Sequence, residues 1–196
     1  MELIIVRHAL PHRADGDNAT ADPELAETGH HQAKATANFL FGERIDAVVA
    51  SPLRRAHQTA EPFAGHLGVT IETVEGLREI DPFGGAYVPA EEMTDDHPIV
   101  QAFVDDRYSL FGSEAGFERF RDVVVGAFDH LVEQHKGKRV AVFCHGTVIG
   151  TYLASLLDHD DPFAFLPDYC GISRVLASGG LRTMRSVNET GHVRGL

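Results

Sequence analysis

The sequence is poor in cysteine, has no tryptophan and contains no long apolar run. Its two cysteines, Cys144 in an apolar run and Cys170 in a predicted loop, make no disulfide framework. No apolar stretch approaches the length of a membrane-spanning helix. The amino terminus lacks the basic patch, apolar segment and cleavage site of a secretory signal. These absences predict a soluble protein of the reducing cytoplasm, with no membrane partner.

Positive charge is also scarce. The formal net charge is −12 with neutral histidines, and there are 3 lysines against 14 arginines. This balance argues against nucleic acid or an anionic membrane as a partner. A local cluster of arginines would still bind a small anion, because the planar guanidinium pairs with phosphate or carboxylate oxygens.

Short apolar runs predict the strands. The run Leu3–Val6 is rich in β-branched residues, which is typical of a strand buried on both faces, and Pro11 prevents its extension. Further strands are predicted at 45–51, 69–76 and 138–145. A closing antiparallel hairpin is predicted from 171–177 and 181–187, joined by Ser-Gly-Gly.

Helical spacing predicts helices between these strands, at residues 29–41, 53–68, 114–136 and 146–158. Thr28 is predicted to cap the first helix, and Ser113 and Gly137 to bound the third. Pro62 predicts a kink or break in the second helix.

Alternating strands and helices predict an α/β fold: a three-layer sandwich with a mostly parallel central sheet, helices on both faces and the antiparallel C-terminal hairpin. With 196 residues, 43% of them hydrophobic, the chain suits a single domain over 1–196. Residues 90–112 show no clear period, and the segment 82–112 is interpreted as a lid-like insertion. Its aromatic side chains, Tyr87 among them, are consistent either with a wall for a substrate's leaving group or with simple packing.

Ligands of open α/β sheets bind beyond the carboxyl ends of the strands. The polar side chains predicted at or just beyond those ends are Arg7, His8, Ser51, Arg54, Arg55, Arg78, Glu79, Asp81 and His145. Arginines and helix N-termini together suit a dianionic phosphoryl group. A neutral histidine nitrogen can attack phosphorus, and a carboxylic acid can protonate the departing oxygen. Fixed positive charges can stabilise the transition state, so no metal or cofactor is expected.

The ordered motifs resemble the histidine phosphatase superfamily, which includes cofactor-dependent phosphoglycerate mutase. "IIVRHA" is similar to the family's strand followed by R-H-G, and "SPLRRAHQTA" matches S-x-L-x-R-A-x-x-T-A throughout. "LREI" matches L-x-E, and "VFCHGTVIG" resembles the late strand that ends in H-G. "PELAETGHHQA" is similar to P-L-T-x-x-G-x-x-Q-A. The resemblance spans almost the whole chain in the right order.

That resemblance implies a metal-independent phosphomonoesterase with His8 as the phosphorylated nucleophile. Arg7, Arg55 and His145 would hold the phosphoryl group, with His145 also counted among the catalytic residues. Glu79 would be the proton donor, although Asp81 lies two residues away and is an alternative. The expected partner is a small phosphorylated substrate; the sequence names neither that substrate nor an oligomeric state.

Two departures keep alternatives open. Ala9 stands where the family has glycine, which removes backbone freedom or space near the phosphate, and Thr147 replaces the second glycine of H-G-G. One alternative is mutase-type transfer of the phosphoryl group to a substrate hydroxyl, although no E-R-H-Y-G-like segment occurs in 82–112. The other is a weakly active phosphate- or phosphopeptide-binding module, because a fold alone does not determine function.

Overall fold

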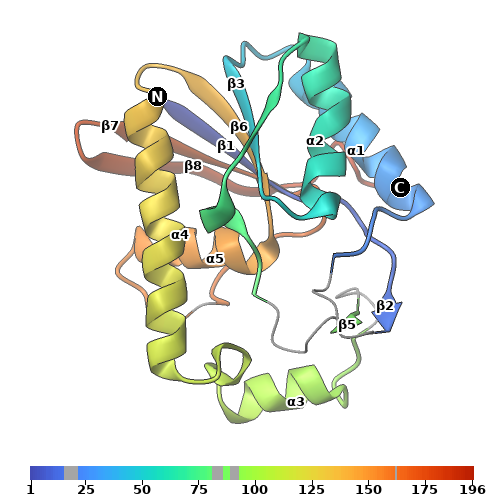
Figure 1. Ribbon diagram of the computed structural model, residues 1–196, viewed down its shortest axis with the longest axis vertical. Helices are drawn as coiled ribbons and strands as arrows, with labels where there is room; N and C mark the ends of the chain where they lie inside the picture. The colour runs from blue at the N-terminus through green and yellow to red at the C-terminus, as the bar shows by residue number, and fades with distance from the viewer. Residues whose placement is uncertain (16–21, 81–85, 89–92, 162) are drawn as a thin grey trace.

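The computed structural model describes residues 1–15, 22–80, 86–88, 93–161 and 163–196. A six-stranded sheet with the order β4-β3-β6-β1-β7-β8 lies at its centre (Figure 1). Its strands are β1 (Glu2–Arg7), β3 (Ala47–Ala50), β4 (Ile71–Thr73), β6 (Arg139–Cys144), β7 (Ile172–Ser178) and β8 (Leu181–Glu189). The first four in the sheet order are parallel, whereas β7 and β8 form the predicted antiparallel hairpin. The predicted fold class is therefore confirmed.

Helices cover both faces of the sheet because β1 and β6 are apolar on both faces. Leu3 and Ile5 of β1 pack on the side of α4 (Glu114–Gln134) and α5 (Gly146–Ser155). Ile4 and Val6 pack on the opposite side, with α1 (Glu27–Leu40) and α2 (Arg54–Leu67). All four β1 side chains are 0% exposed, so the strand separates two cores and the sandwich has three layers.

The predicted cap of the first helix was wrong, and the second helix has no break. Helix α1 begins at Glu27 after an extended Ala26, so Thr28 lies inside the first turn and caps nothing. Helix α2 continues through Pro62 without a break. The buried residues Phe63 and Ala64 that follow Pro62 pack into the core beside the sheet, and this burial offsets the lost backbone hydrogen bond. Ser113, by contrast, caps α4 as predicted, since its hydroxyl accepts a hydrogen bond from the Gly116 amide at 3.1 Å.

The segment 82–112 contains more regular structure than its sequence pattern predicted. It holds β5 (Ala86–Tyr87), which pairs antiparallel with β2 (Ala14–Asp15), and helix α3 (Pro98–Asp105). A short 3-10 helix follows at Ser109–Phe111. The prediction of irregular structure over 90–112 was wrong because α3 has only eight residues, fewer than the window in which a helical period can be recognised from sequence. Figure 1 shows α3 at one end of the molecule, away from the sheet.

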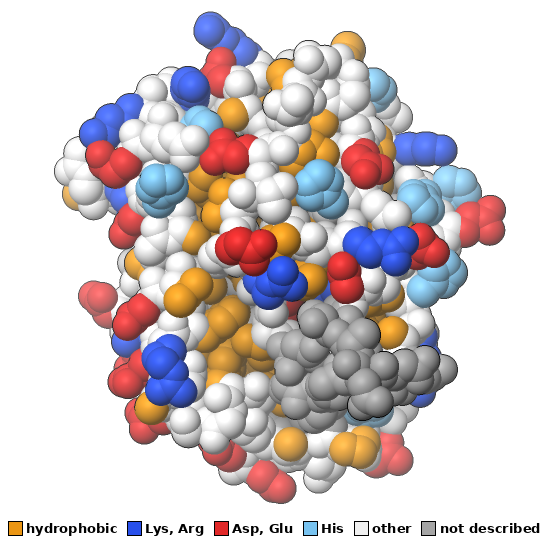
Figure 2. Space-filling view, viewed as in Figure 1, with side chains coloured by type: hydrophobic (Ala, Val, Ile, Leu, Met, Phe, Trp, Pro, Cys, Tyr) orange, Lys and Arg blue, Asp and Glu red, His pale blue; other side chains and the backbone are white. Residues whose placement is uncertain are grey.

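The surface carries mixed charge on the face that Figure 2 shows. Acidic and basic side chains are interspersed there, and apolar side chains gather in its lower half. In the described part of the chain, no helix combines the length and apolar character needed to cross a bilayer.

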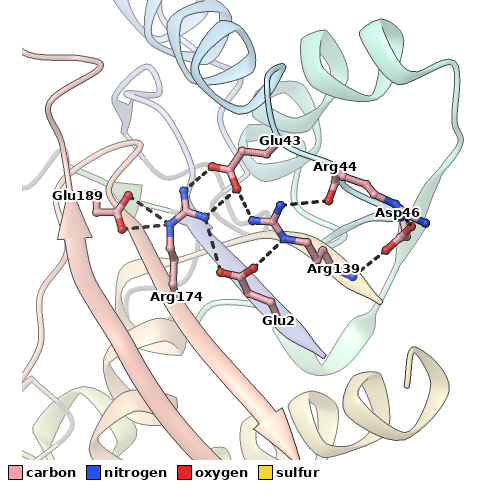
Figure 3. A network of polar contacts seen from close by, with 7 residues as sticks. All are labelled: Glu2, Glu43, Arg44, Asp46, Arg139, Arg174 and Glu189. Carbon is pink, nitrogen blue, oxygen red and sulfur yellow. Dashed lines mark hydrogen bonds and ion pairs between the residues drawn. The ribbon is translucent and has the colours of Figure 1, made fainter. Parts of the chain in front are cut away.

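A network of ion pairs joins the start of β1 and β6 to β7, β8 and the end of α1 (Figure 3). Arg174 bonds Glu43 at 2.6 Å and Glu189 at 3.0 Å. Arg139 bonds Glu2 at 2.7 Å and also contacts Glu43. Glu43 therefore accepts from two arginines, and its hydrogen bond with Arg174 is the main cause that lowers its pKa.

Glu43→Gln is expected to lower the free energy of unfolding at pH 7 by about 1–3 kcal/mol, a value between those of exposed and buried ion pairs. The folded state holds the pKa of Glu43 below its ordinary value, so the contribution is present at neutral pH and is lost as pH falls through that lowered pKa. Denaturant unfolding at several pH values measures this. The control is Glu133→Gln, which removes an exposed pair with Lys136. An equal loss of unfolding free energy in both variants would show that the network stabilises the fold no more than an exposed ion pair does.

Candidate active site

The carboxyl ends of β1 and β6 bring two histidines together. Arg7 is in register with Cys144, and the His8 amide donates to the Cys144 carbonyl at 2.9 Å. The next residues of each chain segment, His8 and His145, consequently have ring centroids 5.1 Å apart. Arg55 lies in the first turn of α2, the helix that follows β3, and its side chain contacts His8. It is 2% exposed. The structure thus assembles four of the predicted site residues at one edge of the sheet.

Hydrogen bonds determine which nitrogen of His8 can react. Its Nδ1 lies 2.8 Å from the carbonyl oxygen of Ala9, and because a carbonyl only accepts, Nδ1 carries the proton. Nε2 then holds a lone pair, and it accepts from Arg55 Nε at 3.3 Å. Burial, followed by the charges of Arg55 and Arg7, holds the pKa of His8 well below its usual value. The imidazole is therefore neutral at pH 7, with its lone pair directed at an arginine.

Two further buried nitrogens face this region without a hydrogen-bond partner among the described residues: Arg7 Nε and His145 Nδ1. The Arg7 guanidinium is anchored through Nη1, which donates to the Pro167 carbonyl at 2.8 Å. A Cβ on Gly146 would lie 3.5 Å from Arg7 Nε, so the start of α5 closely approaches the arginine. Arg7 Nε is a donor, and so is His145 Nδ1 when the Ser51 hydroxyl donates to Nε2. Buried donors without partners are costly, and oxygens of an anion would satisfy them.

His145 is 0% exposed and is oriented by Ser51, whose hydroxyl lies 2.7 Å from Nε2. Burial, followed by the charge of Arg55, lowers the pKa of His145 well below its usual value. Ser51 also accepts a hydrogen bond from the Leu53 amide at 3.3 Å. The sequence motif placed Ser51 near the site, but its contact with His145 depends on how β3 and β6 pair and was not predicted.

Glu79 lies at the N-terminus of α5, the helix that begins directly after His145. One carboxylate oxygen accepts from the Thr147 amide at 3.2 Å and the other from the Ile80 amide at 2.9 Å. The residue keeps part of its surface exposed, yet burial of the carboxyl raises its pKa, against a smaller lowering by Arg55. Asp81, the alternative proton donor, lies outside the described residues.

Two tyrosines complete the site, and neither was predicted as a site residue. The Tyr87 and Tyr169 ring centroids lie 6.4 and 5.5 Å from that of His8. Tyr87 belongs to the segment 82–112, where the sequence was equally consistent with a substrate wall or with packing for its ring. Tyr169 precedes β7 in a loop with no recognisable motif, so only the tertiary structure reveals its place. Among the described residues, no group of three or more histidine, cysteine or acidic side chains is arranged to hold a metal ion.

Ala9, the departure from the family's glycine, fits its position without strain. Its backbone φ is outside the left-handed region, and its amide donates to Thr59 Oγ1 at 2.9 Å. The side chain is 0% exposed and packs with Leu25, Ala33 and Cys170. The methyl group thus belongs to a small apolar cluster beside His8.

Ala9→Gly is expected to lower the free energy of unfolding by about 1 kcal/mol, because a buried methyl is lost and the unfolded chain gains freedom. Turnover should change less than about twofold, since the backbone conformation at this position does not require glycine. Thermal unfolding and steady-state kinetics measure the two effects. A glycine variant that turned over many times faster would show instead that Ala9 restrains catalysis.

The sequence matches the family model of the histidine phosphatase superfamily (branch 1) over residues 3–190. The uncharacterized phosphatase PhoE of Bacillus subtilis is 26% identical over 139 residues, which cover 71% of this chain and 67% of that protein. The human 6-phosphofructo-2-kinase/fructose-2,6-bisphosphatase 4 is 32% identical over 139 residues, 70% of this chain but only 29% of that protein.

The fold is similar to that of a phosphoserine phosphatase from Entamoeba histolytica, solved in complex with 3-phosphoglyceric acid. The TM-score is 0.76 at 24% sequence identity, covering 98% of both chains. The family match spans the elements that carry Arg7, His8, Arg55, Glu79 and His145. This protein belongs to branch 1 of the histidine phosphatase superfamily and is a phosphatase.

Proposed function

We propose that the protein is a metal-independent phosphomonoesterase that works through a phosphohistidine on His8, with Glu79 as general acid and base. One observation carries the proposal: His8 is buried, neutral and held in the tautomer that directs the Nε2 lone pair into a site lined by arginines. This is the state that a histidine needs to attack phosphorus.

In the first step, His8 Nε2 forms a bond to phosphorus while the bond to the leaving oxygen breaks. The leaving oxygen takes the bonding electron pair and receives the proton of the Glu79 carboxyl. Burial of this carboxyl raises its pKa and so favours the protonated form that the step requires. The products are a free alcohol, a Glu79 carboxylate and a phosphoryl group on His8.

In the second step, the Glu79 carboxylate takes a proton from water as the water oxygen attacks phosphorus. The phosphorus–nitrogen bond breaks, its electron pair returns to Nε2, and inorganic phosphate leaves. Glu79 is again protonated and His8 is again neutral, so both groups are restored for the next cycle.

Arg7, Arg55 and His145 would bind the phosphoryl oxygens through both steps. The buried Arg7 Nε and His145 Nδ1 have no partner among the described residues, which suits donors whose acceptors belong to the substrate. The two guanidinium groups supply the positive charge that a metal ion supplies in other phosphatases, so these steps require no metal or cofactor.

We infer a small phosphorylated molecule as the substrate. Arg55 and His8 are each 2% exposed, and a site this enclosed admits a phosphoryl group on a compact alcohol more readily than one on a protein surface. The Entamoeba phosphatase of the same fold, solved with 3-phosphoglyceric acid, is consistent with this size class.

The test is phosphate release from sugar phosphates, glycerate phosphates, nucleotides, phosphopeptides and an aryl phosphate, with EDTA present throughout. Turnover that survives chelation is expected, and the preferred compound identifies the substrate class. Transfer to an added hydroxyl acceptor in place of water would favour the mutase alternative. Phosphate binding by calorimetry without any turnover would favour the binding module and overturn the proposal.

A further inference from the structure

Each of the two phosphate-site arginines packs against a tyrosine ring. The Arg7 guanidinium carbon lies 3.9 Å from the centroid of the Tyr169 ring, and that of Arg55 lies 5.0 Å from the Tyr87 ring. The two tyrosine hydroxyls are 3.2 Å apart, within hydrogen-bond distance. The two arginines are therefore connected through a pair of rings that also flanks His8.

Tyr169 is presented by a turn that several contacts hold in place. Cys170, the next residue, has a φ of +57°, an unfavourable conformation for a residue with a side chain. The Cys170 amide donates to the Arg7 carbonyl at 3.1 Å, and the Gly171 amide closes the turn onto the Asp168 carbonyl at 2.9 Å. The residues that directly follow Tyr169 are thus bonded to the backbone of Arg7, the residue whose guanidinium the Tyr169 ring contacts.

A side chain of β8 also holds this turn through hydrogen bonds. The Asn188 side chain accepts from the Asp168 amide at 2.9 Å and donates to the Asp168 carboxylate at 2.8 Å. A Cβ on Gly171 would lie 2.1 Å from the Asn188 side-chain oxygen, so only glycine fits there. Tyr169 itself is 4% exposed. The ring against Arg7 is thus rigidly held.

Tyr87 is the more loosely attached ring. It lies on the two-residue strand β5, outside the central sheet, and it is half-buried. Its hydroxyl lies within hydrogen-bond distance of the Tyr169 hydroxyl, which links β5 to the site. The fixed ring of Tyr169 therefore gives the ring of Tyr87 its position over Arg55.

We propose that Tyr169 and Tyr87 are positioning residues, which hold Arg7 and Arg55 in the geometry that binds the phosphoryl oxygens and couple the two arginines through their hydroxyl contact. The inference rests on the proposed function of this site and adds the residues that preorganise it. A guanidinium packed face-on against a ring keeps the N–H donors at its own edge free for planar binding of oxygens. Without the ring, Arg7 would keep the Pro167 contact but could rotate about it.

The experiment compares Tyr169→Leu and Tyr169→Phe, with inorganic phosphate as the probe, by calorimetry and as a competitive inhibitor. Tyr169→Leu removes the ring and is expected to weaken phosphate binding about tenfold, in the range of cation–π contacts. Tyr169→Phe keeps the ring and is expected to weaken phosphate binding no more than about threefold, the effect of losing one hydroxyl. KM should rise with the phosphate dissociation constant while kcat changes less.

Tyr87→Phe and the double Phe variant test the coupling. Each single variant breaks the same hydroxyl contact. The double variant should therefore bind phosphate no more weakly than the single variant with the lower affinity. Tyr108→Leu is the matched control, because Tyr108 is a half-buried tyrosine that stacks on Phe117 outside the site. It should leave phosphate binding unchanged. Thermal unfolding of every variant separates loss of positioning from loss of fold.

The proposal is overturned if Tyr169→Leu, while folded, binds phosphate within twofold of wild type, or if Tyr169→Phe is as defective as Tyr169→Leu. Additive effects of the two Phe substitutions would overturn the coupling. Calorimetric phosphate binding needs no turnover. If the catalytic proposal failed, for instance because His8→Ala remained active, the binding comparison would still decide the role of the tyrosines.

Discussion

His8→Ala is expected to abolish phosphate release, with kcat lower by about 10⁴-fold or more, as when a covalent nucleophile is removed from other enzymes. The neighbouring groups cannot replace it. His145 is directed by Ser51 and is itself expected to donate to the phosphoryl group. The carboxylate of Glu79 is bound to two backbone amides. His8 Nε2 carries the lone pair that faces Arg55 Nε, at 3.3 Å.

A quenched-flow experiment with substrate labelled in the phosphoryl group measures this directly. Wild type should trap a labelled protein that loses its label in acid and keeps it in base, the behaviour of a phosphorus–nitrogen bond, and His8→Ala should trap none. The matched control is His130→Ala, because His130 is an exposed histidine on α4. Label retained in acid, or substantial turnover by a folded His8→Ala variant, would rule out the phosphohistidine.

Glu79→Gln is expected to slow kcat by about 10²- to 10⁴-fold for substrates with alcohol leaving groups, because the amide cannot transfer a proton. The loss should be much smaller for phosphorylation by an aryl phosphate, whose leaving group departs without a proton. Glutamine can still accept the Thr147 or Ile80 amide through its carbonyl oxygen, so the fold at the start of α5 should be retained.

The pH dependence of the two half-reactions gives a second measurement. Burial raises the pKa of Glu79, so the protonated form persists above the usual pH range of a carboxyl and is lost as pH rises through the raised value. Phosphorylation of His8 should therefore slow with rising pH, and dephosphorylation, which needs the carboxylate, should quicken. Burial lowers the pKa of His8, so the nucleophile stays neutral throughout. Both pH dependences, the falling limb of phosphorylation and the rising limb of dephosphorylation, should disappear in Glu79→Gln.

Asp81→Asn is the control that resolves the alternative left by the sequence. If Glu79 is the proton donor, Asp81→Asn keeps both pH limbs and most of its activity. If Asp81→Asn instead shows the large loss for alcohol leaving groups and Glu79→Gln does not, the roles are exchanged and the assignment of Glu79 is wrong.

The fold could be predicted from sequence where a pattern is local and repeated. β1 and β6 are short continuous apolar runs, and burial on both faces leaves no other place for them than the centre of a sheet. Ser113 caps α4 because a cap depends on neighbours within one turn. The predictions failed where tertiary packing outweighs local preference. Examples are the break expected at Pro62, which α2 does not show, and α3, which is too short for its helical period to be recognised from sequence.

The candidate site divides in the same way. The sequence by itself determined which residues are proposed to carry the chemistry: Arg7, His8, Arg55, Glu79 and His145 lie in ordered motifs at predicted strand ends and helix starts. Their protonation states, by contrast, depend on burial and on charges brought in from distant parts of the chain. The tautomer of His8 and the raised pKa of Glu79 are therefore properties of the tertiary structure.

Only the tertiary structure also decided the surroundings of the site. Ser51 reaches His145 because β3 and β6 are adjacent strands, and Tyr169 reaches Arg7 because β7 pairs antiparallel with β1. Tyr87 and Tyr169 are 82 residues apart in the sequence, and their hydroxyls meet because Tyr87, on β5, and Tyr169, before β7, both lie beside His8. Contacts across such separations leave no periodic or motif signal, since each depends on how whole elements pack and not on neighbouring residues.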